Sequence, residues 1–343
     1  MLKGKQSWTF KNKPIIIGTG VSGGPFEANG KLSEDFDVLY DDLWIKQESY
    51  EKAHRKLLED AVQHALKKSK LKEENIQFFM AGDLINQITP SSFAARTNGI
   101  PYMGLFGACS TSMEGLALAA FIVNNGGAHH ILTGASSHNA AVEKQFRYPT
   151  EYGGQKPPTA QWTITGAGVG IVAQADSRTG SYPEVTAATI GKVIDMGLKD
   201  PFNMGGAMAP AAVDTIMAHF EDTGQSADDY DLIITGDLGR IGRETALDLL
   251  KEKGNRINQE KFQDCGLMLF KEDQPVLAGG SGAGCSAVVL YGHLLNQMRQ
   301  GVYKKILLVA TGALLSPLSI QQKDSIPCIA HAVSIEYRGT ELT

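Results

Sequence analysis

The stretch GACSTSMEG, residues 107–115, places one cysteine where a strand gives way to a helix. Residues 101–106 have an extended pattern, and the apolar residues after the turn continue in helical order until 124–127 end the run. A thiol at a helix start lies near unpaired backbone amides, which favour negative charge and make Cys109 a candidate nucleophile. The alternative is a small buried residue, since free cysteine is among the most buried residue types. The turn alone leaves both interpretations open.

The composition is that of a globular protein. The 343 residues are 43% hydrophobic, and Lys and Arg are spread along a chain with a formal net charge of −5. This pattern lacks the basic patch of a nucleic-acid-binding protein. The first residues lack the apolar core of a signal peptide, and no apolar run reaches the roughly 20 residues that span a bilayer. We therefore expect a soluble protein that stays inside the cell and has no nucleic-acid partner.

Two further patterns argue against common cofactor sites. Cys109, Cys265, Cys285 and Cys328 are widely spaced, which predicts neither a disulfide framework nor a zinc site. The glycine cluster at 18–24 follows a strand, but polar and irregular residues come next instead of the helix that a dinucleotide fingerprint must open. The sequence therefore predicts no cofactor and no metal site of its own.

The same order of elements occurs twice in the chain. A strand, an amphipathic helix and a second strand are expected at 15–20, 50–69 and 76–81 in the first copy, and at 186–195, 213–220 and 232–234 in the second. Both second strands end in Gly-Asp-Leu, which contains Asp83 or Asp237. Each copy then brings a cysteine, Cys109 or Cys285, into a small-residue turn, and a later strand ends in Thr-Gly-Ala. Four landmarks in the same order indicate a duplication.

The spacing of these landmarks predicts the domain organisation. The two cysteines are 176 residues apart and the two aspartates 154, so the second copy holds about 22 extra residues, which fit within 244–273. Strands that alternate with amphipathic helices are typical of parallel sheets covered by helices on both faces. We predict a layered α/β fold with parallel or mixed sheets. Its duplicated halves, residues 1–180 and 181–343, form one compact domain.

This duplicated arrangement, with a cysteine at the buried helix start of the first half, resembles the thiolase fold of β-ketoacyl synthases and thiolases. The resemblance implies that Cys109 stands where the family carries its acyl group. In the condensing enzymes it also implies a histidine after the second-half strand and an asparagine in the second glycine turn, which together polarise a thioester carbonyl. Segments 234–239 and 280–285 contain neither. Loss of one such donor typically costs roughly 10²- to 10³-fold in rate, so decarboxylative condensation is not expected.

The chain also resembles true thiolases, which use a different histidine from the condensing enzymes and a second cysteine near the C-terminus. His331 and Cys328 are the candidates for these roles, although the flanking glycines of the thiolase turn are missing. We expect a protein without catalytic activity. An acyl transferase of the β-ketoacyl synthase or thiolase type, with Cys109 as nucleophile, stays open as the alternative.

Longer stretches carry a more specific resemblance. FRYPTEYG at 146–153, QWTITGAG at 161–168 and NMGGAMAP at 203–210 are similar to the stage V sporulation protein AD family of spore-forming bacteria. The resemblance implies a thiolase-like protein without known condensing activity, in the channel apparatus that moves dipicolinic acid (pyridine-2,6-dicarboxylate), with calcium, into the spore and out during germination. It implies membrane proteins of the spore channel as partners, and a peripheral place on the cytoplasmic side of the spore inner membrane. It leaves open whether calcium binds with the ligand and whether the usual homodimer of the fold persists.

A pocket for dipicolinate needs convergent N–H or cationic donors and a face on which its ring can stack. The backbone amides after Cys109 suit an anion without any charged side chain. The candidate ligand-binding residues are Cys109, Asp83, Ser110, Ser137, His138, Arg147 and Trp162, with Ser136, Lys156, Tyr148 and Tyr152 as further candidates. The alternative for the polar candidates is that they are solvated loop residues. The alternative for Trp162, Tyr148 and Tyr152 is that they pack as ordinary structural aromatics. One interpretation of Asp83 is contact with a calcium ion that arrives with the ligand. The alternative is that Asp83 caps the next turn, and the aspartate at the matching position of the second copy, Asp237, favours this structural role.

Overall fold

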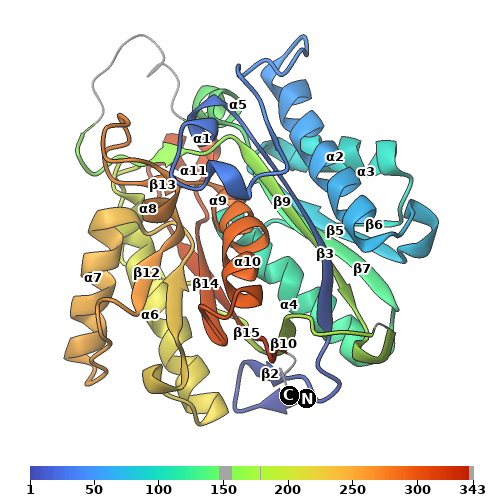
Figure 1. The fold of residues 1–343 in the computed structure, drawn as a ribbon. Helices are drawn as coiled ribbons and strands as arrows, with labels where there is room; N and C mark the ends of the chain where they lie inside the picture. Colours follow the sequence, from blue (N-terminus) through green and yellow to red (C-terminus); the bar gives the residue numbers. More distant parts are fainter. Residues whose placement is uncertain (147–156, 178, 340–343) are drawn as a thin grey trace.

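The computed structural model of the chain describes residues 1–146, 157–177 and 179–339, and one mixed sheet runs through its centre (Figure 1). The main strands lie side by side in the order β12 (Phe262–Asp264), β11 (Leu232–Thr235), β14 (Lys305–Ala313), β15 (Cys328–Glu336), β10 (Glu184–Thr189), β3 (Ile15–Gly23), β9 (Gly166–Ala173), β7 (His130–Ser137), β5 (Phe78–Gly82) and β6 (Tyr102–Gly104). The short strands are β1 (Leu2–Lys3), β2 (Ser7–Thr9) and β4 (Val38–Leu39) at the sheet margins, and the separate pair β8 (Trp162–Thr163) and β13 (Gly280–Ser281).

The strand order repeats. β6-β5-β7-β9-β3 in the first half matches β12-β11-β14-β15-β10 in the second. The directions match as well, because β5 and β11 are parallel to both neighbours, whereas β9 and β15 are antiparallel to both. The two halves meet where Glu184 of β10 pairs with Ile15 of β3. The predicted α/β fold with two duplicated halves is confirmed.

Helices separate the strands in both halves. They are α1 (Pro25–Ala28), α2 (Tyr50–Ser69), α3 (Thr89–Asn98), α4 (Thr111–Asn124), α5 (Asn139–Phe146), α6 (Met204–Thr223), α7 (Gly239–Glu252), α8 (Cys265–Leu269), α9 (Ala283–Val288), α10 (Leu295–Arg299) and α11 (Pro317–Gln321), with a π-helical turn (Val289–Leu294) between α9 and α10. α2 and α4 end where the sequence predicted. Ser49 caps α2 by accepting from the Lys52 amide at 3.2 Å, and Lys70 ends it in the left-handed conformation.

The helices form three layers. α2 and α3 cover the outer face of the first half, α6 and α7 cover that of the second, and α4 and α9 lie between the two halves (Figure 1). The buried apolar residues form three clusters that correspond to these layers. In β7, Ile131 belongs to the central cluster and its neighbour Leu132 to the outer one. Successive side chains of a strand point to opposite faces, so both faces of the sheet are apolar and covered.

One detail differs from the sequence prediction. The strand expected at 186–195 ends at Thr189, and Ile194 pairs separately with Cys328 in an isolated antiparallel bridge. Between them, a side chain at Gly191 would lie 1.8 Å from the carbonyl oxygen of Ala330. The extra residues of the second copy fall on both sides of β12. α7 is longer than its counterpart α3, and α8 with the loop to β13 follows β12, so the extra length begins within the expected range 244–273 and continues toward β13.

The glycine cluster at 18–24 is part of a helix-to-sheet contact. Gly18 and Gly20 lie inside β3, every residue of which is buried. A Cβ atom at Gly20 would lie 1.8 Å from the Ala61 carbonyl oxygen, and one at Gly18 would lie 2.8 Å from that of Ala65. Glycine at these positions therefore lets the backbone of α2 approach the sheet.

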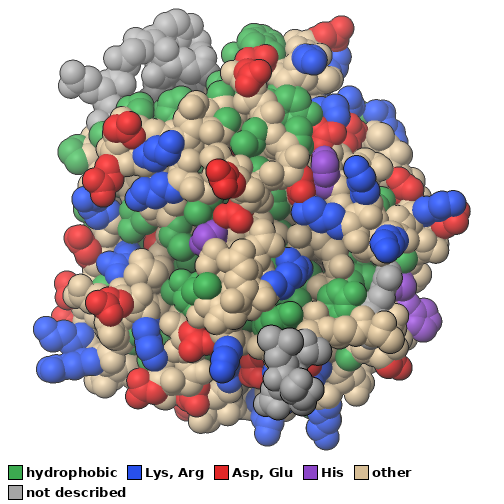
Figure 2. All heavy atoms as spheres, in the orientation of Figure 1, with side chains coloured by type: hydrophobic (Ala, Val, Ile, Leu, Met, Phe, Trp, Pro, Cys, Tyr) green, Lys and Arg blue, Asp and Glu red, His purple; other side chains and the backbone are tan. Residues whose placement is uncertain are grey.

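The surface shows no concentration of one charge on the face drawn in Figure 2, where basic and acidic side chains are intermingled. Within the described part of the chain, no helix combines the length and apolar content that a membrane crossing needs.

Candidate functional site

A short 3₁₀ turn (Ala108–Ser110) carries Cys109 from β6 into α4. The turn is closed by local hydrogen bonds, because the Ser110 amide and hydroxyl both donate to the Gly107 carbonyl oxygen, at 3.0 and 2.6 Å. Gly312 of β14 packs directly on it, and a Cβ atom there would lie 2.4 Å from the same oxygen. The second half of the molecule therefore fixes the start of α4.

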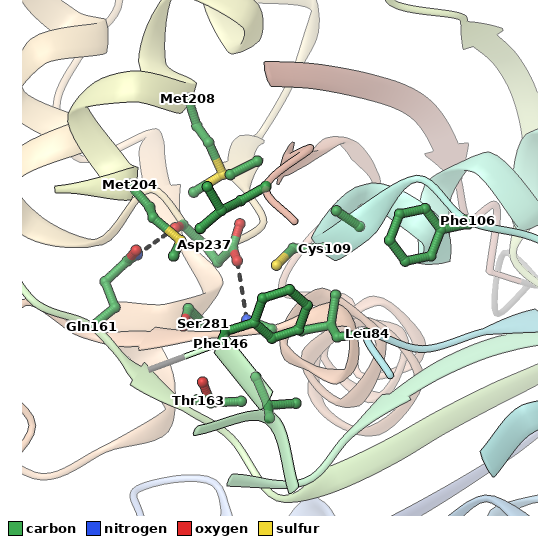
Figure 3. Close-up of a pocket in the computed structure, with 15 residues that line it drawn as sticks. Leu84, Phe106, Cys109, Phe146, Gln161, Thr163, Met204, Met208, Asp237 and Ser281 are labelled. Carbon is green, nitrogen blue, oxygen red and sulfur yellow. Dashed lines mark hydrogen bonds between the residues drawn. The ribbon is translucent and has the colours of Figure 1, made fainter. Parts of the chain in front are cut away.

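A cavity lies over this turn, at the junction of the two halves (Figure 3). Its lining residues are Leu84, Phe106, Ala108, Cys109, Val142, Phe146, Gln161, Thr163, Met204, Met208, Asp237, Ser281, Gly282, Ala313 and Leu315. The centres of water molecules can occupy about 50 Å³ of it. This is enough for a few waters. The walls are mainly apolar, and Phe106, which is 52% exposed, marks the side that opens to solvent.

The Cys109 thiol and the Asp237 carboxyl lie next to one another in this cavity (Figure 3). A hydrogen bond from Cys109 is among the contacts that stabilise the Asp237 carboxylate. Asp237 also accepts from the Gly282 amide at 3.0 Å and from the Thr311 hydroxyl at 2.7 Å. Burial raises the pKa of Asp237 to about 7, although these hydrogen bonds act in the opposite direction. Asp237 therefore changes its protonation state near neutral pH.

A second buried carboxyl, Asp264 at the end of β12, is an electrostatic neighbour of Asp237 but does not line the cavity. It accepts from the Thr235 hydroxyl at 2.7 Å and from the backbone amides of Leu238 and Gly239 at 2.8 and 3.1 Å. These amides open α7, so Asp264 caps that helix. Burial raises its pKa to about 6. Because Asp264 satisfies the helix start, Asp237 is available to the cavity.

Asp83, the first-half counterpart of Asp237, has a different role. It is fully buried, does not line the cavity, and accepts from the backbone amides of Ile85 and Ser91 at 2.8 and 2.9 Å. The Ser91 amide belongs to the first turn of α3, so Asp83 caps this turn, which is the structural alternative that the sequence left open. The cap is not common to both copies, since the equivalent helix in the second half uses Asp264.

Of the other predicted ligand-binding residues that the structure describes, Cys109 alone lines the cavity. Ser110 closes the turn, and the Ser137 hydroxyl donates to the Ile164 carbonyl oxygen at 2.9 Å. Trp162 stacks on Phe26 with ring centroids 4.3 Å apart. None of these three lines the cavity. The predicted residues Arg147, Tyr148, Tyr152 and Lys156 lie outside the described residues.

His138 belongs to a buried cluster on the other side of β7. Its Nε2 atom is 2.7 Å from the Leu43 carbonyl oxygen, and its ring lies beside those of Tyr50 and His54. Ser136 joins the cluster through a 3.0 Å hydrogen bond to His54. Burial lowers the pKa of His138 to about 4, so its ring is neutral at neutral pH and offers no positive charge to an anion.

The two residues that would serve a true thiolase mechanism are also away from the cavity. Cys328 pairs with Ala313 across the β14–β15 ladder and is fully buried, and burial raises the pKa of its thiol to about 12. His331 accepts from the Gly191 amide at 3.2 Å, and burial lowers its pKa to about 4. Neither residue lines the space in front of Cys109.

Several lining residues come from the stretches QWTITGAG and NMGGAMAP, which carried the family resemblance but were not predicted to line a cavity. Gln161 and Thr163 flank Trp162 in QWTITGAG, and Met204 and Met208 lie in NMGGAMAP. Strand alternation puts Gln161 and Thr163 on the face opposite Trp162, and the i, i+4 spacing puts both methionines on one face of α6. These spacings could have pointed to the pairs, but not to the cavity that they share.

Cys109 is the partly exposed cysteine, whereas Cys265, Cys285 and Cys328 are buried. Burial raises the pKa of the Cys265 and Cys285 thiols well above the usual range. We therefore expect iodoacetamide to alkylate Cys109 before the other three in the folded protein, as measured by peptide mass spectrometry. Faster labelling of any buried cysteine would contradict this geometry.

The described side chains include no cluster suited to a metal ion. Residues 1–146, 157–177 and 179–339 contain no group of three or more His, Cys, Asp and Glu side chains placed to hold a metal ion.

Comparison with known structures identifies the fold. The chain superposes on 3-oxoacyl-[acyl-carrier-protein] synthase III from Aquifex aeolicus with a TM-score of 0.57 at 14% identity, covering 94% of this chain and all of that one. Human mitochondrial 3-ketoacyl-CoA thiolase gives 0.62 at 12% identity, covering 96% and 100%. Cerulenin-bound OleA from Xanthomonas campestris gives 0.62 at 13%, covering 96% and 97%. The chain therefore has the thiolase-like fold.

Sequence comparison identifies the family. Residues 4–336 match the family model of stage V sporulation protein AD (SpoVAD). The chain is 50% identical over 338 residues to stage V sporulation protein AD of Bacillus subtilis (strain 168), and the match covers 98% of each protein. The chain belongs to the stage V sporulation protein AD family.

Proposed function

We propose that this protein is a non-catalytic sporulation protein that binds dipicolinic acid or its calcium chelate in the cavity over Cys109. In this proposal it acts in dipicolinate uptake during sporulation and in its release during germination. The observation that carries the proposal is the Asp237 carboxyl, which faces the Cys109 thiol at the strand end where the condensing enzymes resembled by the chain have a histidine. In this proposal the chain keeps a cavity over the cysteine, but the polar side chain next to the thiol is an aspartate instead of a histidine.

The cavity chemistry argues against acyl transfer. Transfer through a cysteine needs a thiolate and hydrogen-bond donors for the developing oxyanion. An ionised Asp237 would repel both negative charges. The described lining residues include no histidine, lysine or arginine to offset that repulsion.

The same cavity suits a small planar acid in two respects. Leu84, Val142 and the two methionines give apolar walls for a ring, and Gln161, Thr163 and Ser281 add polar side chains to the lining. The space is narrow, so a ring must displace water and separate the side chains at the opening. Phe106 is half exposed, so its side chain has room to move, whereas Phe146 at the end of α5 is partly buried and packs on the core.

Titration calorimetry on the full chain tests the proposal. We expect saturable binding of dipicolinate, in the presence or absence of calcium chloride, and much weaker binding of picolinate, which lacks one carboxylate. Calcium chloride without dipicolinate is the control for the metal alone. No heat of binding up to millimolar dipicolinate under either condition would refute the proposed function.

The enzyme alternative keeps one supporting observation, because the Cys109 thiol lines a cavity next to a helix start. Incubation with acyl-CoA followed by intact mass measurement decides between the two. We expect no stable adduct. An acyl adduct that is lost in Cys109→Ser would establish the acyl transferase instead.

The family resemblance also supports a proposal about location. We place the protein at the cytoplasmic side of the spore inner membrane, held by membrane proteins of the channel. Co-purification with those proteins from spore membranes at moderate salt, and loss of the protein from membranes that lack them, would support it. Recovery of the protein entirely apart from the membrane fraction would contradict it.

A further inference from the structure

The cavity has an unusual charge balance for a site that takes an acid. Asp237 and Cys109 are the ionisable side chains among its described lining residues. Neither can supply a positive charge. A doubly charged ligand would therefore meet a carboxyl group at the wall and, among the described lining residues, no cation.

Among the residues that the structure describes, the groups around Asp237 add no positive charge. Thr311 of β14 and Gly282 at the start of α9 donate hydrogen bonds to it, and Cys109 completes the set. Its other titratable neighbours are Asp264 on β12, Cys265 on α8, Cys285 on α9 and Cys328 on β15. All of these are neutral or negative, so an ionised Asp237 makes the described part of the cavity wall negative.

We propose that Asp237 is the charge-selecting residue of this cavity, which admits an aromatic dicarboxylate only together with a compensating proton or divalent cation. This inference rests on the proposed function. When the ligand enters as a free dianion, one proton moves from solvent to an Asp237 carboxyl oxygen, and the resulting O–H donates to a ligand carboxylate. When the ligand enters as its chelate, Asp237 stays ionised and faces the cation. In both cases the unfavourable pairing of carboxylates is avoided.

The raised pKa of Asp237 makes this selection act near neutral pH. Below about pH 7 the carboxyl is already protonated, so the dianion meets a neutral group. Above that pH the proton must be taken up on binding. By proton linkage, affinity for the free dianion then falls by as much as tenfold for each pH unit. Carboxylic acids titrate well below this range, so the ligand itself keeps its charge.

The experiment measures dipicolinate dissociation constants at pH 6 and pH 8, with and without calcium, for the wild type, Asp237→Asn and Asp83→Asn. Asp83 is the matched control, because it is a buried carboxyl at the equivalent strand end, burial raises its pKa to about 6, and it does not line the cavity. We expect calcium-free affinity to fall about tenfold from pH 6 to pH 8 in the wild type and in Asp83→Asn, and calcium to restore it. Asp237→Asn should show neither dependence.

The outcomes separate this inference from the proposed function. If Asp237→Asn keeps the wild-type dependence on pH and calcium, the inference is wrong and the proposed function stands. If the wild type binds under none of the conditions, the proposed function is wrong. Calorimetry of the wild type in two buffers of different ionisation enthalpy needs no variant. At pH 8 it should show uptake of about one proton per free dianion and none per chelate, and equal proton counts would contradict the inference.

Discussion

Replacing Ala313 with leucine is expected to weaken dipicolinate binding about a hundredfold while the fold is retained. Ala313 ends β14 and lines the cavity, in which water centres reach only about 50 Å³. Three added carbons would occupy the space that the ring needs, and inserting methylene groups into a packed site costs about 1–3 kcal/mol. A cost of this size corresponds to one or two factors of ten in affinity.

Cys109→Ala is the matched control for this variant, because it removes an atom from the same cavity wall instead of adding three. It also removes the hydrogen bond to Asp237, so we expect affinity within about tenfold of the wild type. Calorimetry gives both constants, and circular dichroism checks the fold. Wild-type affinity in Ala313→Leu would place the ligand outside this cavity.

Replacing Gly20 with alanine is expected to lower the free energy of unfolding by about 3 kcal/mol or more. The added methyl group would lie 1.8 Å from the Ala61 carbonyl oxygen, and it cannot be accommodated by a side-chain rotation because the clash is with backbone. α2 would have to move away from β3, which disturbs a fully buried apolar cluster. Urea unfolding, followed by circular dichroism, measures the loss.

Gly339→Ala controls for the loss of glycine itself. A Cβ atom at Gly339 would meet nothing closer than 3.7 Å, so its effect should stay within about 0.5 kcal/mol, as for most surface substitutions. Equal stability of Gly20→Ala and Gly339→Ala would contradict the close approach of α2 to the sheet.

The fold was predictable because its signals are local and repeated. The apolar face of 50–69 and the glycines after Asn124 set two helices, and the paired landmarks around Asp83 and Asp237 set the duplication. The strand at 186–195 was extended too far, and the residues beyond Thr189 meet β15 through the close approach at Gly191 and the bridge from Ile194 to Cys328. Sequence patterns do not contain such long-range contacts.

The site was predicted only in part for the same reason. Cys109 was found at the cavity from its turn, but the sequence favoured Asp83 over Asp237 as the carboxyl next to it, and the structure puts Asp237 in the cavity lining. The difference between them depends on Asp264, which lies on another strand and caps α7 in place of Asp237. A helix start needs one cap, and which residue supplies it is decided by tertiary structure.

A crystal structure of the protein soaked with dipicolinate and calcium tests the central claim most directly. We predict ligand density in the cavity over Cys109, with the ring between the apolar walls and one carboxylate or the cation next to Asp237. Density at any other place, with this cavity holding only water, would contradict the claim.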